Sequence, residues 1–160
     1  MPKIEARNKK EAPTPQGPHV AEKLMEPGDY EVTDSHTFEV KINLLKKDGR
    51  WQVVKGGEGV DSHTCVFRLW KYDEMVGLKK QATSYDTTRR IHTVDQDVLN
   101  RLKIQKLLVS WTFGDHNPRL KIHRVQGVLT DESWDNFKRL QTNIIDYIFR
   151  GMNEVLDFNG

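Results

Sequence analysis

Residues 38–55, FEVKINLLKKDGRWQVVK, contain two short β-like runs on either side of Lys47-Asp48-Gly49-Arg50. Asp-Gly between two such runs is a strong signal for a tight hairpin turn. We therefore predict an antiparallel hairpin with strands over 38–46 and 51–55. This hairpin is the most strongly indicated β element in the chain.

The segments that follow predict a loop, a strand and a helix. Residues 55–63, KGGEGVDSH, are rich in glycine and predict a flexible connection. Residues 64–70, TCVFRLW, alternate well enough to predict a third strand. Asp73 is placed to cap a helix that runs to about Thr83. The 3/4 spacing gives that helix one apolar face, made of Met75, Leu78 and Ala82.

The strongest helix signal follows a polar stretch, TTRRIH. Thr93 or Asp95 can cap a helix over 94–111. One predicted face combines Val98, Leu102, Gln105 and Val109, and it is widened by Ile104, Leu107, Leu108 and Trp111. Gly114, Asn117 and Pro118 end this helix through a turn.

The remaining chain predicts a connector and two helices. Residues 119–125, RLKIHRV, read as a strand or an extended connector. One helix is expected after Thr130 or Asp131, and the last after Thr142 or Asn143. The last helix carries a regular apolar stripe made of Ile145, Ile148, Phe149, Met152 and Val155 or Leu156.

These elements predict an α+β fold, with a small antiparallel β-sheet in the N-terminal half followed by a helical C-terminal half. The chain has 160 residues, which is the length of one domain, and we expect that domain to span 30–160. Residues 1–29 hold five of the six prolines and few apolar side chains. They predict a flexible or extended N-terminal arm, either disordered or ordered on a neighbouring subunit.

Composition excludes several classes of protein. Hydrophobic residues make up 36% of the chain, enough for a core, so full-length disorder is not expected. A single cysteine, Cys65, excludes an intrachain disulfide framework and a multi-cysteine zinc site. No apolar run reaches the length of a membrane span, and MPKIEARNKKE lacks the apolar region of a signal peptide. We therefore expect a soluble protein of a reducing compartment.

Charge is distributed unevenly along the chain. Residues 79–106 hold seven basic and three acidic residues, whereas 131–160 hold six acidic and three basic residues. The two segments could attract each other within the fold or between subunits. The basic cluster, with Tyr85 inside it, also suggests nucleic-acid binding as an alternative function. The net charge of only +2 and the helical setting of several of these residues favour a solvated face instead.

No residue pattern carries recognisable catalytic chemistry. His63 and Cys65 share a predicted strand face, but a strand cysteine more often serves as a small buried hydrophobe. Gly56, Gly57 and Gly59 lack the phosphate-loop pattern. His116 and His123 have no further ligand at metal-binding spacing. We therefore predict no enzymatic activity, no cofactor and no metal site.

Residues 65–160 resemble the tail assembly chaperones of tailed bacteriophages. The resemblance is carried by Phe67-Arg68-Leu69-Trp70, by Leu107-Leu108-Val109-Ser110-Trp111, and by Leu129-Thr130-Asp131-Glu132 followed by Leu140. The sequence departs from the family pattern at Leu69, where a proline is usual. The 1–29 arm and the 38–55 hairpin also have no counterpart in that pattern.

The resemblance implies a phage-encoded protein of the host cytoplasm. It would bind the long, helix-rich tape-measure protein, present it to tail-tube subunits, and leave before the tail matures. Amphipathic helices with surplus apolar width suit this role, because they can accept a partner's helices and shield them from aggregation. The departures from the family pattern leave an alternative function, that of a structural virion protein of the tail or connector whose arm clasps neighbouring subunits. Both functions are compatible with a homo-oligomer.

The candidate partner-binding residues lie in the last two predicted helices, with a basic pair as an electrostatic rim. Large apolar side chains there are either core or contact residues. The candidates are Trp134, Phe137, Ile145, Phe149 and Met152, with Arg89 and Arg90 as the rim.

Overall fold

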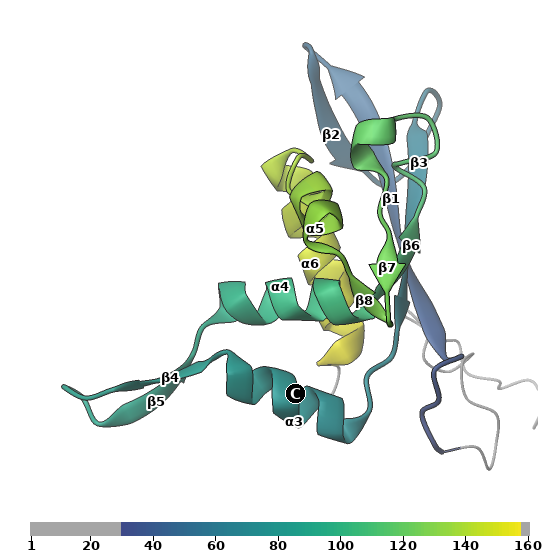
Figure 1. Ribbon diagram of the computed structural model, residues 1–160. Coiled ribbons are helices and arrows are strands. Elements are labelled where there is room, and N and C mark those ends of the chain that lie inside the picture. Colours follow the sequence, from purple (N-terminus) through teal and green to yellow (C-terminus); the bar gives the residue numbers. More distant parts are fainter. Residues whose placement is uncertain (1–29, 158–160) are drawn as a thin grey trace, which may run out of the picture. The chain divides into compact units, whose positions relative to one another are not determined.

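A computed structural model describes residues 30–157, so the predicted N-terminal arm, 1–29, lies outside the described residues. Figure 1 shows the elements in chain order. They are β1 (Thr37–Lys47), β2 (Arg50–Val54), β3 (Asp61–Arg68), α3 (Tyr72–Gln81), β4 (Thr83–Asp86), β5 (Ile91–Val94), α4 (Gln96–Leu107), β6 (Leu108–Trp111), a 3-10 helix (Pro118–Leu120), β7 (Arg124–Val125), β8 (Val128–Leu129), α5 (Asp131–Phe137) and α6 (Thr142–Leu156). The predicted α+β fold is confirmed.

The predicted first hairpin is confirmed as β1 and β2. Lys47 lies opposite Arg50, which leaves a two-residue turn made of Asp48 and Gly49. Both turn residues have positive φ, 54° and 79°. This conformation matches the right-handed twist of the flanking strands, and it explains why Asp-Gly predicts the turn.

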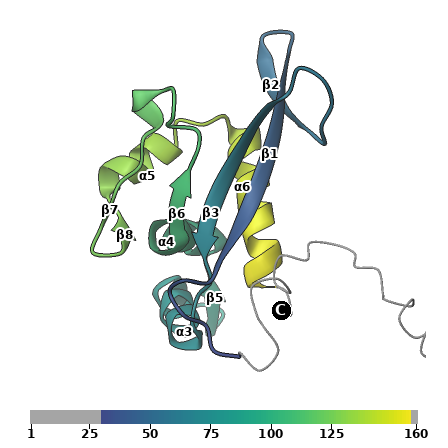
Figure 2. The same ribbon diagram turned by 90° about the vertical axis from the view of Figure 1, so that its right-hand side faces the viewer.

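The main sheet has four antiparallel strands in the order β2-β1-β3-β6. Phe38, Val40, Ile42 and Leu44 alternate along β1 and are buried. Phe38 stacks on Phe67 of β3, with their ring centroids 5.3 Å apart. Helix α6 packs on β1 and β2, and Figure 2 shows it running along the sheet. The main core therefore lies between this sheet and the helices.

The predicted helix over 94–111 is wrong at its C-terminal end. Helix α4 ends at Leu107, and Leu108–Trp111 form β6 on the edge of the main sheet. Cys65 of β3 lies opposite Trp111, and Leu108 is fully buried. Pairing with β3 thus overrides the local helical pattern.

The predicted buried face of α4 is confirmed at Ile104 and Leu107 and wrong elsewhere on the helix. Its buried residues are Leu99, Asn100, Lys103, Ile104 and Leu107, whereas Val98 is exposed and Leu102 and Gln105 are half-buried. Two polar side chains therefore lie on the face that is packed.

A polar network between α4 and α6 satisfies these two side chains. Lys103 is fully buried and donates to Asn153 Oδ1 at 2.7 Å and to Asp157 Oδ2 at 3.2 Å. Asn100 Oδ1 accepts a hydrogen bond from Asn153 Nδ2 at 3.0 Å. Desolvation lowers the pKa of Lys103, and Asp157 opposes that shift. The opposite charge surplus of the two segments is thus used in part within the fold.

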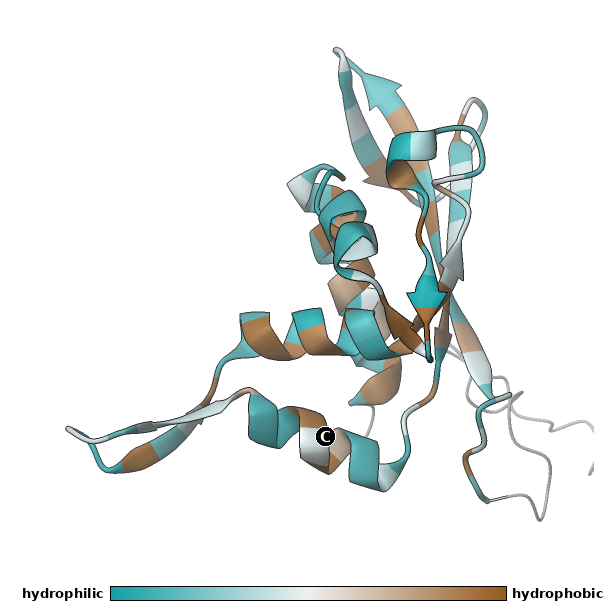
Figure 3. Ribbon diagram, viewed as in Figure 1, coloured by the Kyte–Doolittle hydropathy of each residue, from teal (hydrophilic) through white to brown (hydrophobic). Residues whose placement is uncertain are grey.

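The polar stretch 87–92, before α4, lies in a β-hairpin. In this β4–β5 hairpin, Tyr85 lies opposite His92 and their ring centroids are 4.9 Å apart. The hairpin projects from α3 and α4 (Figure 1), and it carries hydrophobic as well as polar residues (Figure 3). Arg90, at its turn, has a φ of 57° although it is not glycine.

Helix ends agree with the predictions in part. Asp95 caps α4 by accepting hydrogen bonds from the amides of Asp97 and Val98, and Thr130 caps α5. Asp73 does not cap α3, which begins at Tyr72 with Lys71 as its N-cap residue. Helix α6 begins at Thr142 with Gln141 as its N-cap residue, slightly earlier than predicted, so neither Thr142 nor Asn143 caps it.

Two connections differ from the predictions. The strand predicted over 64–70 begins earlier, at Asp61, and ends at Arg68, so 61–63 belong to the sheet rather than to the flexible connection. In the 119–125 connector, a 3-10 helix at Pro118–Leu120 comes before the short strand β7.

Candidate functional site

The predicted partner-binding residues divide between the core and the surface. Phe137 and Met152 have no exposed area, so they belong to the core. Trp134, Ile145 and Phe149 are half-buried and keep part of each side chain accessible. The structure therefore leaves three of the five apolar candidates available for a partner.

Two of these side chains, Trp134 and Phe149, pack on one buried ring. Phe137 stacks on Trp134 with their ring centroids 5.3 Å apart, and on Phe149 with a separation of 5.9 Å. Ile145 lies one helical turn before Phe149 on α6 and so neighbours it on the same helix face. We call the group formed by Trp134, Ile145 and Phe149 the α5–α6 surface.

Two cations flank the α5–α6 surface. The Arg101 guanidinium lies 5.7 Å from the centroid of the Trp134 ring, and Lys138 Nζ lies 5.9 Å from it. Sequence reasoning missed both as site residues. The position of Lys138 four residues after Trp134 is a usable helical signal, whereas Arg101 comes from α4 and is brought there only by tertiary packing.

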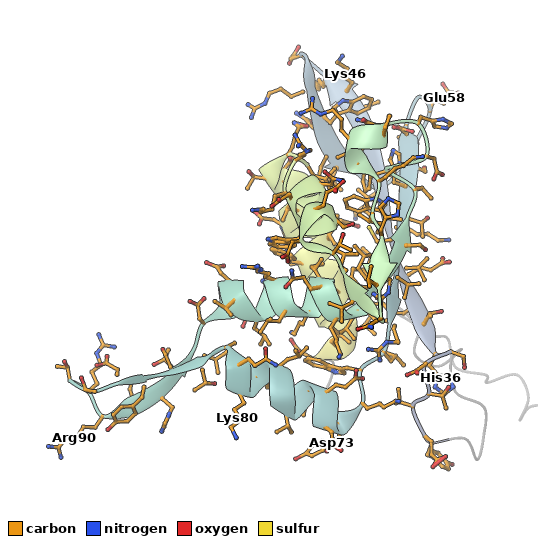
Figure 4. All side chains as sticks on the ribbon, in the orientation of Figure 1. His36, Lys46, Glu58, Asp73, Lys80 and Arg90 are labelled. Atoms are coloured by element: carbon orange, nitrogen blue, oxygen red, sulfur yellow. The ribbon has the colours of Figure 1, made fainter. Side chains whose placement is uncertain are left out.

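Arg89 and Arg90 do not join this surface. They lie at the turn of the β4–β5 hairpin, which extends away from α5 and α6, and Figure 4 labels Arg90 at its end. Arg89 Nε lies 3.8 Å from Asp86 Oδ2. The predicted electrostatic rim is therefore replaced at the helices by Arg101 and Lys138.

The first motif behind the family resemblance has a structural role. Phe67 is fully buried, and Trp70 is buried with Lys103 Nζ 5.0 Å from its ring centroid. Arg68 binds both carboxylate oxygens of Glu74, at 2.9 and 2.8 Å. This motif thus joins the end of β3 to the start of α3.

The two other motifs are structural as well. Leu107, Leu108 and Leu129 are buried. Trp111 Nε1 donates to the Leu120 carbonyl oxygen at 2.7 Å, and Thr130 caps α5. The buried residues of these motifs therefore fix the fold, and none of them belongs to the α5–α6 surface.

The Cys65 thiol is fully buried, and burial raises its pKa well above the usual range. His63 makes its ring contacts elsewhere: Nδ1 lies 3.0 Å from Thr112 Oγ1 and Nε2 lies 2.9 Å from Asp61 Oδ2. The two residues do not hydrogen-bond to each other. In the part of the chain that the structure describes, no three His, Cys, Asp or Glu side chains gather as a metal site.

Comparisons with protein-family models, with curated proteins and with solved structures give no match to the chain. Within 30–157, none of the helices is long and apolar enough to cross a membrane.

Proposed function

We propose that this protein is a tail assembly chaperone of a tailed bacteriophage. It binds the tape-measure protein in the host cytoplasm and assists assembly of the tail tube. The observation that carries the proposal is the α5–α6 surface, where large apolar side chains from two helices remain partly exposed around the buried Phe137 ring.

This surface suits one face of a partner helix. Aromatic side chains that are already held in place lose little conformational entropy on binding and are the usual anchors of interfaces. Stacking on Phe137 fixes the rings of Trp134 and Phe149. An amphipathic helix of the tape-measure protein would cover them with its apolar stripe.

The flanking cations define the partner further. Arg101 and Lys138 lie beside Trp134, so a partner helix with acidic residues next to its apolar stripe gains complementary charge. A chaperone of this kind works by contact, so the proposal requires no catalysis and no cofactor. Covering apolar helices of an unassembled partner limits their aggregation.

The test is co-expression of the tagged protein with the tape-measure protein from the same genome. We expect the two to purify together. Ile145→Glu places a charge on the α5–α6 surface and should abolish co-purification. Tyr147→Glu is the matched control, because Tyr147 lies on the same helix, is 37% exposed and belongs to a different face.

Circular dichroism shows whether both variants fold. Loss of the tape-measure protein from folded Ile145→Glu but not from Tyr147→Glu supports the proposal. Equal retention by both variants contradicts the assigned surface. Mass spectrometry of purified particles tests the virion alternative, because a chaperone is absent from mature particles and a structural protein is present.

A further inference from the structure

A second site lies away from the α5–α6 surface and shares no residue with it. It is a pocket of about 390 Å³ between β3, the segment after β6 and the turn that joins α5 to α6. This volume falls within the range of roughly 300–1,000 Å³ that is typical of small-ligand pockets. Its apolar lining consists of Leu44, Trp51, Phe113, Leu120, Leu140 and Ile144.

The amide groups in the pocket lining have their oxygen atoms occupied. Asn117 Oδ1 accepts from the Arg119 amide at 3.0 Å, and Gln141 Oε1 accepts from the Trp51 amide at 3.2 Å. These bonds fix which way each side-chain amide is turned. Asn117 Nδ2 and Gln141 Nε2 then remain as donors that have no hydrogen-bond partner within 30–157.

Arg139 adds charge to these donors. Its Nε donates to Asn136 Oδ1 at 3.3 Å, and its two terminal nitrogens have no partner in the described part of the chain. The carboxylate in the lining, Asp61, is already bound to His63 Nε2 at 2.9 Å. The other nitrogen of His63 is paired with Thr112, and the ring stacks on Phe113 with their centroids 4.1 Å apart. Asn117 and Arg139 are exposed and Gln141 is half-buried, so these donors are accessible to an acceptor that enters the pocket from solvent.

We infer that this pocket binds a carboxylate carried on an apolar body. The carboxylate accepts hydrogen bonds from Arg139, Asn117 and Gln141, and the apolar part packs against Trp51 and Phe113. Both a small organic acid and the C-terminus of a polypeptide that ends in an apolar residue present this chemistry. The inference does not depend on the proposed chaperone function.

The test uses nuclear magnetic resonance of the four tryptophan indole N–H groups in the full chain. The probes are 4-phenylbutyrate, N-acetyl-L-phenylalanine and the uncharged 4-phenyl-1-butanol. We expect both acids to shift the Trp51 signal, which Trp51→Phe identifies, and to leave the buried Trp70 signal in place. The phenylbutyrate should bind roughly tenfold tighter than the alcohol, because hydrogen bonds to a charged group are the stronger ones.

Arg139→Gln tests the charged contact directly. It should weaken phenylbutyrate binding roughly tenfold and leave phenylbutanol binding unchanged. Arg150→Gln is the matched control, because Arg150 is exposed on α6 and lies outside the pocket lining. Tighter binding of N-acetyl-L-phenylalanine assigns the site to a polypeptide C-terminus, and tighter binding of phenylbutyrate assigns it to a small acid.

Three results would overturn the inference. They are equal binding of phenylbutyrate and phenylbutanol, equal shifts at all four indoles, and an Arg139→Gln variant that binds the acids as tightly as the original chain. Because none of these measurements involves the tape-measure protein, failure here leaves the chaperone proposal as it stands.

Discussion

Replacing Glu74 with glutamine should destabilise the protein in a way that depends on pH. Glu74 accepts two hydrogen bonds from Arg68, at 2.9 and 2.8 Å, and one from the Lys71 amide at 3.0 Å. The bond from Arg68 is the largest cause of a pKa of about 2 for this carboxyl, below its ordinary value of 4.5. The side chains of Arg68 and Glu74 are 11% and 21% exposed, so solvent screens the pair only weakly.

The size of the effect follows from the pKa difference. At about 1.4 kcal/mol per pKa unit, lowering the pKa from 4.5 to about 2 corresponds to roughly 3 kcal/mol of folding free energy. Because the folded-state pKa lies below the unfolded-state value, this contribution is complete above pH 4.5. It is lost as the pH falls toward 2, with about 2 kcal/mol gone by pH 3.

Urea denaturation of both proteins at about pH 7 and about pH 3 checks this prediction. At pH 7, Glu74→Gln should lower the free energy of unfolding by about 2–3 kcal/mol, and at pH 3 the difference should shrink to about 1 kcal/mol. Asp73→Asn is the control, because the exposed Asp73 precedes Glu74 in the same helical turn. It should change the free energy of unfolding by less than about 1 kcal/mol. A Glu74→Gln effect that is no larger than the control, or that stays constant with pH, would refute the reasoning.

Three further predictions concern the core. Gly151→Ala should lower the free energy of unfolding, measured by thermal unfolding, by about 1–3 kcal/mol, because the alanine Cβ would lie 2.7 Å from Val40 Cγ1. Adding Val40→Ala should reduce this loss, and additive losses in the double variant would contradict the contact. In urea denaturation, Asp157→Asn should lower the free energy of unfolding by about 1–3 kcal/mol, because it leaves the buried Lys103 ammonium without its charged partner. Lys103→Met removes the ammonium itself and should destabilise the protein less, and a larger loss for Lys103→Met would exclude this explanation. Iodoacetamide should label Cys65 in urea but not in the folded protein, because the thiol is buried and its pKa is raised; rapid labelling under native conditions would show that it is accessible.

The parts of the fold that were predicted correctly have local causes. Asp48 and Gly49 specify their own turn, and Asp95 and Thr130 hydrogen-bond to amides two or three residues away. Such signals can be recognised without knowing the rest of the structure. They were sufficient for the first hairpin, for the starts of α4 and α5, and for the α+β class.

The wrong predictions have distant causes. Lys103 lies on the buried face of α4 because Asn153 and Asp157, about fifty residues later, satisfy its ammonium. Residues of β6 leave the helical pattern because β3 offers a strand to pair with. The β4–β5 turn was missed because Arg90 adopts a positive φ that is normally a glycine signal.

In the candidate site, too, local patterns were recognised in the sequence and the effects of distant residues were not. Apolar spacing identified Trp134, Ile145 and Phe149, but it did not separate them from the buried Phe137 and Met152. That separation depends on which side of each helix the sheet and α4 cover. Arg101 likewise reaches Trp134 only because the tertiary fold brings a residue of α4 to a ring of α5.

Site-specific photocrosslinking in the presence of the tape-measure protein tests the central claim most directly. A benzophenone amino acid at position 134 or 149 places the reactive group on the α5–α6 surface, and the same group at position 92 places it on the β4–β5 hairpin. We expect crosslinks to the tape-measure protein from positions 134 and 149 and none from position 92. Crosslinks from 92 alone, or crosslinks only to tube or capsid subunits, would contradict it.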